Sequence, residues 1–238
     1  MAPISVGILV YDYQAIDAVG PTDLLNSSSK LLANILRKFI PVEEEVLERA
    51  PDFTFHHIGL TREPVQLLTS NIFIVPTTTV DECPDIDLLL IPGPAPVEFQ
   101  LSEKYAAFIR RHVAEGKLTF STCTGAAVLA AAGVLDGKAA TINNVEYAWV
   151  AKKYPQVKWT KERKWIVDGN LWTASGAVAG MDMFAHWLKE NFGLAVLTLG
   201  ALGLDYEPRD DSGLFTVLPK RYGDDGEQIA THHVPVYN

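Results

Sequence analysis

The sequence predicts a three-layer α/β protein, in which helices cover both faces of a mainly parallel central sheet. The first observation is a set of nearly continuous apolar runs of strand length, typical of buried parallel strands: ISVGILV (4–10), DLLLIPG (87–93) and KLTFSTC (117–123). The second is residues 96–116, whose apolar side chains fall near helical spacing before a glycine. Together with the runs on either side, this segment predicts a right-handed βαβ unit.

The other elements continue this alternation along the chain. Residues 26–50 extend or interrupt a first helix, and the sequence does not place their boundaries. After them we expect strands at 53–60 and 72–80, an alanine-rich helix after Cys123, a short strand at 138–143, a helix at 145–154, strands joined by a DGN turn within 157–176, and a long helix at 179–193.

We expect one domain over residues 1–238, with residues 205–238 as a polar C-terminal extension. Within this extension GLFTVLP (213–219) has the pattern of a strand, which we expect to pack on a partner subunit. The extension is too short for a helix-turn-helix domain, so the pattern disfavours a transcription factor.

Composition excludes several classes of function. The formal charge of −9 opposes nonspecific binding to nucleic acid, and no apolar run approaches the roughly 20 residues of a membrane-spanning helix. The first residues lack the pattern of a secretory leader, and two cysteines, Cys83 and Cys123, are too few for a disulfide framework. We therefore expect a cytoplasmic protein that acts on a small molecule, with neither nucleic acid nor a membrane as a partner.

Cys123 stands at the point where a predicted strand passes directly into a helix, with Gly125 two residues later. This is the pattern of a nucleophile elbow, a tight turn that presents a reactive side chain. At a helix N-terminus, backbone N–H groups favour thiolate over thiol and supply donors to a developing anion. The alternative is a packing role, because a free cysteine is often buried in a core.

Two further segments end at the same predicted edge of the sheet. Asp17 follows the first strand and is interpreted either as a helix N-cap or as a functional carboxylate. The IPGPAP turn (91–96) follows another strand, and it is either a plain turn or a source of backbone N–H groups facing Cys123. In open α/β sheets the carboxyl ends of the strands form the ligand-binding edge, which favours a shared site.

The combined motifs resemble the ThiJ/PfpI superfamily, which has a class I glutamine amidotransferase-like fold, and within it the isonitrile hydratase-like branch. The motifs are I-D-x-x-G-P-x-D at 16–23, L-I-P-G at 90–93, S-T-C-T-G at 121–125 and S-G-A-V-A-G-M-D at 175–182, and the similarity covers about residues 4–195. The resemblance implies a flavodoxin-like fold and a homodimer. It also implies that Cys123 is the nucleophile, Asp17 its acidic partner, and Thr124 a residue whose N–H and hydroxyl face the site.

The resemblance further implies a hydratase or lyase that adds water to an isonitrile to give an N-substituted formamide. Cys123 would attack the terminal carbon while Asp17 delivers or relays a proton, and neither a metal nor a cofactor is expected. The alternatives are another small-molecule transformation by a repurposed relative and a non-enzymatic sensor in which Cys123 is oxidised.

Two positions depart from the family pattern. Pro94 stands where many relatives have a second glycine, and proline has no N–H to donate, so an oxyanion donor would have to come from Gly93, Ala95 or Thr124. Where many relatives have a histidine, this chain has Asn143 and Asn144, which are expected to hydrogen-bond a polar substrate.

Overall fold

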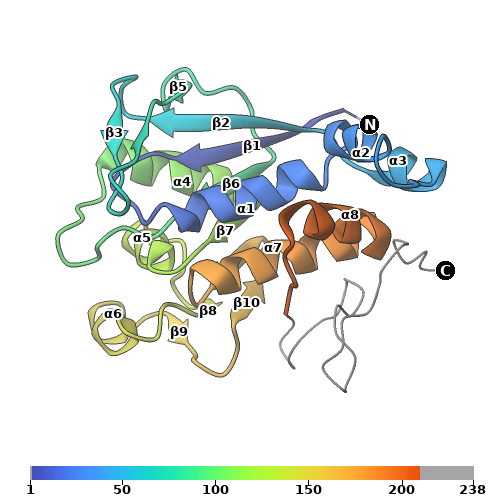
Figure 1. The fold of residues 1–238 in the computed structure, drawn as a ribbon. Helices are drawn as coiled ribbons and strands as arrows, with labels where there is room; N and C mark the ends of the chain where they lie inside the picture. The colour runs from blue at the N-terminus through green and yellow to red at the C-terminus, as the bar shows by residue number, and fades with distance from the viewer. Residues whose placement is uncertain (1, 210–238) are drawn as a thin grey trace. The chain divides into compact units, whose positions relative to one another are not determined.

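The computed structural model describes residues 2–209, which contain a seven-stranded sheet in the order β10-β11-β7-β6-β1-β2-β5. The strands are β1 (Ile4–Leu9), β2 (Phe53–Gly59), β5 (Thr78–Thr79), β6 (Leu88–Ile91), β7 (Leu118–Ser121), β10 (Trp165–Asp168) and β11 (Leu171–Ala174). β6 is parallel to both β1 and β7, β11 is parallel to β7, and β10 pairs antiparallel with β11 at one edge. The predicted α/β class with a mainly parallel sheet is therefore confirmed (Figure 1).

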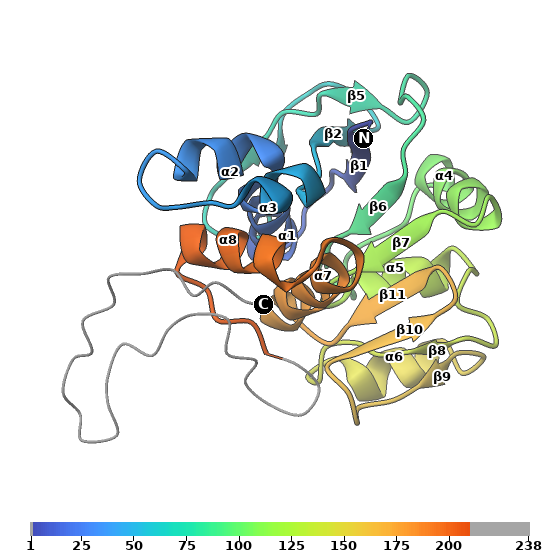
Figure 2. The same ribbon diagram turned by 90° about the vertical axis from the view of Figure 1, so that its right-hand side faces the viewer.

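Helices lie on both faces of this sheet. Figure 2 shows α4 (Glu103–Ala114) on one side of β6 and β7, and the first part of α1 (Ile16–Ser27), residues 16–21, on the other. A short helix, α5 (Gly125–Ala131), follows β7 and packs against β6, β7 and β11. Because β1, β6 and β7 run in the same direction, their carboxyl ends and the loops that follow them share one edge of the sheet.

The apolar runs of the sequence form the centre of the sheet. Leu88, Leu89 and Leu90 of β6 are fully buried, and they pair in register with Val6, Gly7 and Ile8 of β1. A strand covered on both faces has no solvent-facing side, which explains why this run does not alternate with polar residues. On β7, Phe120 is fully buried and stacks on Trp172 of β11, with 5.2 Å between ring centroids.

The chain forms two compact units. One comprises residues 4–21 and 54–183, and it contains nearly all of the sheet. Of the described residues, the other comprises 2–3, 22–53 and 184–209, with α2 (Lys30–Leu36), α3 (Glu44–Arg49), α8 (Leu194–Leu204) and the second part of α7 (Ala177–Phe192). Its core includes Ala33, Leu47 and Leu199, which lie on α2, α3 and α8 in turn.

Several predicted boundaries were wrong. The strand expected at 72–80 is broken at Pro76 into β4 (Phe73–Ile74), which pairs with β3 (Val65–Gln66), and β5 in the main sheet, because proline cannot donate to a sheet ladder. The helix expected over 96–116 begins only at Glu103, where Ser102 caps it by accepting from the N–H of Tyr105.

The region beyond Cys123 also differs from the expectation in detail. The strand expected at 138–143 is only β8 (Ala139–Ala140), and it pairs with β9 (Lys158–Trp159) in a separate two-stranded sheet. The expected helix follows as α6 (Tyr147–Lys153), and the DGN turn joins β10 to β11 as predicted. Helix α8 was not anticipated.

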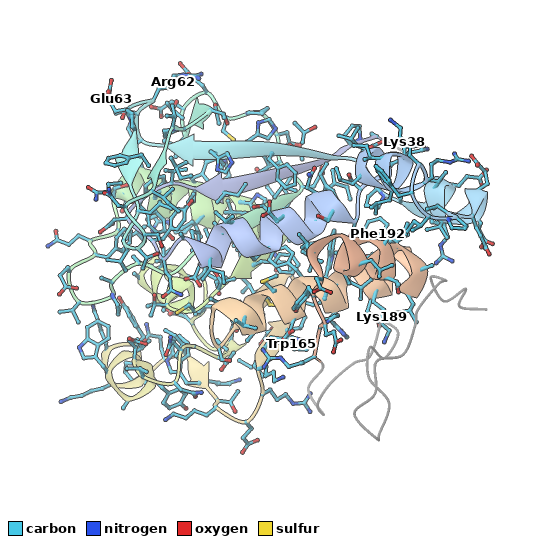
Figure 3. The ribbon with its side chains drawn as sticks, in the orientation of Figure 1. Lys38, Arg62, Glu63, Trp165, Lys189 and Phe192 are labelled. Carbon is cyan, nitrogen blue, oxygen red and sulfur yellow. The ribbon has the colours of Figure 1, made fainter. Side chains whose placement is uncertain are left out.

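Surface contacts hold the loops after β2. Arg62, labelled at the periphery in Figure 3, donates to the carbonyl oxygen of Thr77 at 2.6 Å and to Glu82 at 2.7 Å.

Within residues 2–209 no helix is long and apolar enough to cross a membrane. The strand expected at 213–219 lies outside the described residues.

Candidate active site

Cys123 lies in a strained turn between β7 and α5. Its φ of 53° is in the left-handed region, which a residue with a Cβ seldom adopts and which is common at functional sites. The turn is held because Thr122 donates its N–H to the carbonyl of Ile91 at 3.1 Å and Gly125 donates to that of Thr122 at 2.8 Å. A Cβ on Gly125 would lie 2.1 Å from the Ile91 oxygen, so only glycine fits there. These contacts form the predicted elbow.

Asp17 is a fully buried carboxylate in the first turn of α1. Its Oδ2 accepts the N–H of Gly93 at 2.9 Å, whereas its Oδ1 has no hydrogen-bond partner among the described residues. Burial raises the pKa of Asp17 to about 7, although the bond from Gly93 acts in the opposite direction. The group can therefore both accept and release a proton near neutral pH.

Pro21 leaves the main-chain carbonyl of Asp17 free to accept a hydrogen bond from the elbow. A proline inside a helix has no N–H for the carbonyl four residues earlier, and for Pro21 of α1 that residue is Asp17. The hydroxyl of Thr122 donates to this carbonyl instead, at 3.0 Å. The I-D-x-x-G-P motif thus leaves a main-chain acceptor open, and the residue before the cysteine occupies it.

The IPGP turn packs closely against both segments. A Cβ on Gly93 would lie 2.6 Å from Asp17 Oδ2 and 2.8 Å from the Thr124 nitrogen, so a side chain here would collide with both. The carbonyl of Pro94 accepts the Thr124 hydroxyl at 2.6 Å. The Gly93 N–H is bonded to Asp17 and Pro94 has none, which leaves the N–H groups of Thr124 and the half-buried Ala95 as the remaining backbone candidates.

Asn143 contacts the thiol directly. Its Nδ2 lies 3.0 Å from Cys123 Sγ, and its Oδ1 accepts the N–H of Val145 at 2.9 Å. Because the oxygen is occupied by that backbone donor, the amide presents its N–H₂ to the sulfur. Asn144, by contrast, is exposed. Of the two adjacent asparagines, the structure brings only Asn143 to Cys123.

The thiol itself is not activated in the way the sequence suggested. The pKa of Cys123 is raised to about 11, chiefly by burial, then by the charge of Asp17 and least by that of Glu146. The amide of Asn143 and the N–H of Thr124 lower the pKa but do not reverse the balance. Removal from water favours the neutral thiol, so burial opposes the expected preference for thiolate.

Glu146 was missed by sequence reasoning. It directly precedes α6 without capping it, and its Oε2 is buried with no hydrogen-bond partner among the described residues. Only its place three residues after Asn143 could have drawn attention to it. Within residues 2–209 no three His, Cys, Asp or Glu side chains are grouped so as to hold a metal ion.

The fold and the site define an α/β protein with a cysteine on a nucleophile elbow and a buried carboxylate beside it. Residues 8–190 match the DJ-1/PfpI family, and the chain belongs to that family. A solved structure of a ThiJ/PfpI family protein from Pseudomonas syringae superimposes with a TM-score of 0.68 at 24% identity, covering 87% of this chain and 77% of that one. The flavodoxin-like fold expected from the motifs is thereby confirmed.

Curated relatives differ in what their names describe. An isonitrile hydratase from Pseudomonas putida is 33% identical over 78% of this chain and 81% of its own length. The HTH-type transcriptional regulator GbdR from Pseudomonas aeruginosa is 28% identical over 59% of this chain and 38% of its own length. A deglycase from Pyrococcus horikoshii is 33% identical over 44% of this chain and 60% of its own. Enzymes therefore occur among the relatives, alongside a regulator.

Proposed function

We propose that this protein is a Cys123-dependent hydratase that converts an isonitrile, R–N≡C, into the formamide R–NH–CHO. The observation that carries the proposal is the pairing of the elbow thiol with Asp17, a buried carboxylate whose pKa of about 7 suits proton transfer. The similarity to an isonitrile hydratase over most of both chains supports it. The addition of water to an isonitrile involves no net oxidation or reduction, so the proposed reaction needs no redox cofactor.

In the first step, Asp17 takes the thiol proton and the sulfur of Cys123 bonds to the terminal carbon of the isonitrile. The carbon then receives that proton from Asp17, which gives a thioimidate, Cys–S–CH=N–R. The transfer from Cys123 to Asp17 is uphill, because burial keeps the pKa of the thiol above that of the carboxylate.

In the second step, water adds to the thioimidate carbon and the C–S bond breaks. The bonding electrons return to sulfur, nitrogen gains one proton of the water, and the other restores the thiol. Asn143, whose amide N–H₂ lies on the sulfur, stabilises negative charge there as the thiolate leaves.

The test is turnover of an aryl isonitrile by the purified chain, with the formamide measured by chromatography. Cys123→Ala is expected to abolish the reaction, since no other group on the elbow can form the thioimidate. Cys83→Ser serves as the matched control, because Cys83 lies in a loop before β6, and it is expected to retain full activity. Equal rates for wild type and Cys123→Ala would refute the proposal.

A second candidate is another small-molecule transformation at the same thiol. The deglycase relative and the unusual Pro94 and Asn143 positions favour it. Parallel assays with an aryl isonitrile and a glycated amino acid distinguish the two: this alternative predicts Cys123-dependent release of the amino acid without isonitrile turnover.

A further inference from the structure

We propose that Glu146 is a second proton-transfer residue of this site, which takes a proton from the water that resolves the thioimidate on Cys123. This inference rests on the proposed function for its chemistry. The effect of the Glu146 carboxylate on the thiol is independent of that chemistry and can be measured without an isonitrile.

The segment just before Glu146 contacts the sulfur of Cys123 through Asn143. Asn143 contacts Cys123 Sγ at 3.0 Å through Nδ2, and its Oδ1 holds the N–H of Val145 at 2.9 Å. Glu146 follows immediately, and its side chain does not cap α6. Of the groups that act on the thiol, Asp17 and Glu146 are the two charged ones, and both raise the pKa of Cys123. The thiol therefore experiences the charges of two carboxylates, one in the first turn of α1 and the other at the start of α6.

The unpartnered oxygens indicate what these carboxylates would bind. Within residues 2–209, Asp17 Oδ1 and Glu146 Oε2 are both buried without a hydrogen-bond partner, and so is the hydroxyl of the fully buried Tyr13. Burial raises the pKa of Tyr13 to about 12, and the charge of Asp17 adds to this effect. Leaving a buried acceptor unpaired costs about 1–3 kcal/mol, so such groups call for a ligand that donates hydrogen bonds. An isonitrile has no donor next to its reacting carbon, whereas water has two. The unpaired carboxylate oxygens thus fit the second substrate, water.

The chemistry of the second step gives Glu146 a distinct task. Its carboxylate takes a proton from water as the water oxygen bonds to the thioimidate carbon. It then passes that proton to the nitrogen as the carbonyl forms and the C–S bond breaks. The remaining hydroxyl proton returns to sulfur through Asp17, so every proton is accounted for. Asp17 thus serves the attack of sulfur and its reprotonation, and Glu146 serves the attack of water.

The experiment separates the two steps in the full chain. Wild type and Glu146→Gln are mixed rapidly with an aryl isonitrile, quenched in acid and analysed by intact mass for the adduct, while formamide is measured in parallel. In Glu146→Gln we expect the adduct to form at the wild-type rate and to accumulate, with formamide release slowed by about 10²-fold. Glu146→Asp is expected to recover part of the loss, and Glu162→Gln, which removes an exposed carboxylate, to match wild type.

A second measurement tests the placement without any isonitrile. In a Cys83→Ser background, Cys123 is alkylated with iodoacetamide across a range of pH. Glu146→Gln is expected to move the midpoint to lower pH, because a negative charge beside the thiol is lost, whereas Glu162→Gln leaves it in place. Thermal unfolding confirms that each variant is folded.

The outcomes are distinguishable. An unchanged alkylation midpoint, or wild-type formamide release by Glu146→Gln, overturns the inference and leaves the proposed function standing. Slow release without accumulated adduct would place Glu146 in the first step and also overturns it. If wild type forms neither adduct nor formamide, the proposed function fails, and with it the role of Glu146 toward water, while the midpoint still decides whether Glu146 faces the thiol.

Discussion

The two cysteines of this chain, Cys83 and Cys123, lie in different structural environments. Cys83 lies half-buried in the loop before β6, where burial raises its pKa, the Arg111 guanidinium lowers it and the Asp85 carboxylate raises it. Cys123 is buried in a strained turn, and its pKa is raised to about 11. Both thiols are protonated at neutral pH. The difference is that a buried carboxylate, Asp17, acts on Cys123 and a hydrogen-bond donor, Asn143, contacts its sulfur. In the proposed mechanism, the reactivity of Cys123 therefore depends on proton transfer to Asp17 during the reaction.

The largest expected effect comes from removing that base. Asp17→Asn keeps an oxygen for the Gly93 N–H but cannot take the thiol proton, so kcat/KM for an aryl isonitrile should fall by about 10²–10⁴-fold. Wild-type activity should rise with pH through about 7, where Asp17 loses its proton, and the variant should lack this rise.

Asp23→Asn is the matched control for Asp17→Asn, because Asp23 is an exposed carboxylate on the same helix. It should leave both the rate and the pH profile unchanged. A flat wild-type profile between pH 6 and 8 would contradict the assigned role of Asp17.

The intrinsic reactivity of the two thiols tests the comparison directly. At pH 7 iodoacetamide should modify Cys83 before Cys123, because Cys123 is both less exposed and held as the thiol. Between pH 7 and 9 the rate at Cys123 should rise by about 100-fold, since its thiolate fraction grows tenfold per unit below the pKa. Peptide mapping by mass spectrometry follows each site.

Dilute peroxide in the same experiment addresses the sensor alternative. Oxidation depends on the thiolate, so Cys123 should remain reduced at pH 7. Rapid conversion of Cys123 to a sulfinate while Cys83 stays reduced would reverse the comparison and favour a sensor.

A smaller effect is expected from the hydrogen bond to sulfur. Asn143→Ala removes the amide donor 3.0 Å from Sγ, and the loss of one charge-assisted bond to the leaving thiolate should lower kcat by about tenfold. The alkylation midpoint of Cys123 should move to higher pH. Asn144→Ala changes the exposed neighbour and should affect neither value. Equal effects of the two substitutions would show that the loop as a whole, rather than this contact, matters.

The sequence predicted the elements whose signal is local. The runs that became β1, β6 and β7 are buried on both faces, so their composition alone identified them. The errors occurred where a backbone hydrogen bond decides the boundary. Pro76 divides one apolar run between two sheets, and the Ser102 cap sets the start of α4, beyond Phe99.

The candidate site likewise contains residues that the sequence identified and residues whose roles depend on the tertiary structure. Cys123 and Asp17 could be identified because each stands at a strand end within a recognisable motif. The roles of Asn143 and Glu146 depend on how the chain folds after a two-residue strand, which no periodicity in the sequence signals. The high pKa of Cys123 could not be foreseen either, because desolvation depends on packing that brings residues far apart in sequence around the sulfur.

The hydrogen bond from the Thr122 hydroxyl to the Asp17 carbonyl holds residue 17 at the elbow without using the carboxylate itself. Exchanging the carboxylate at position 17 for another side chain would leave that hydrogen bond intact, because Pro21 keeps the carbonyl open whatever the side chain is. The backbone at position 17 is therefore held in place independently of its side chain. A scaffold built in this way can acquire new chemistry by changing one side chain, without rebuilding the turn that carries the nucleophile.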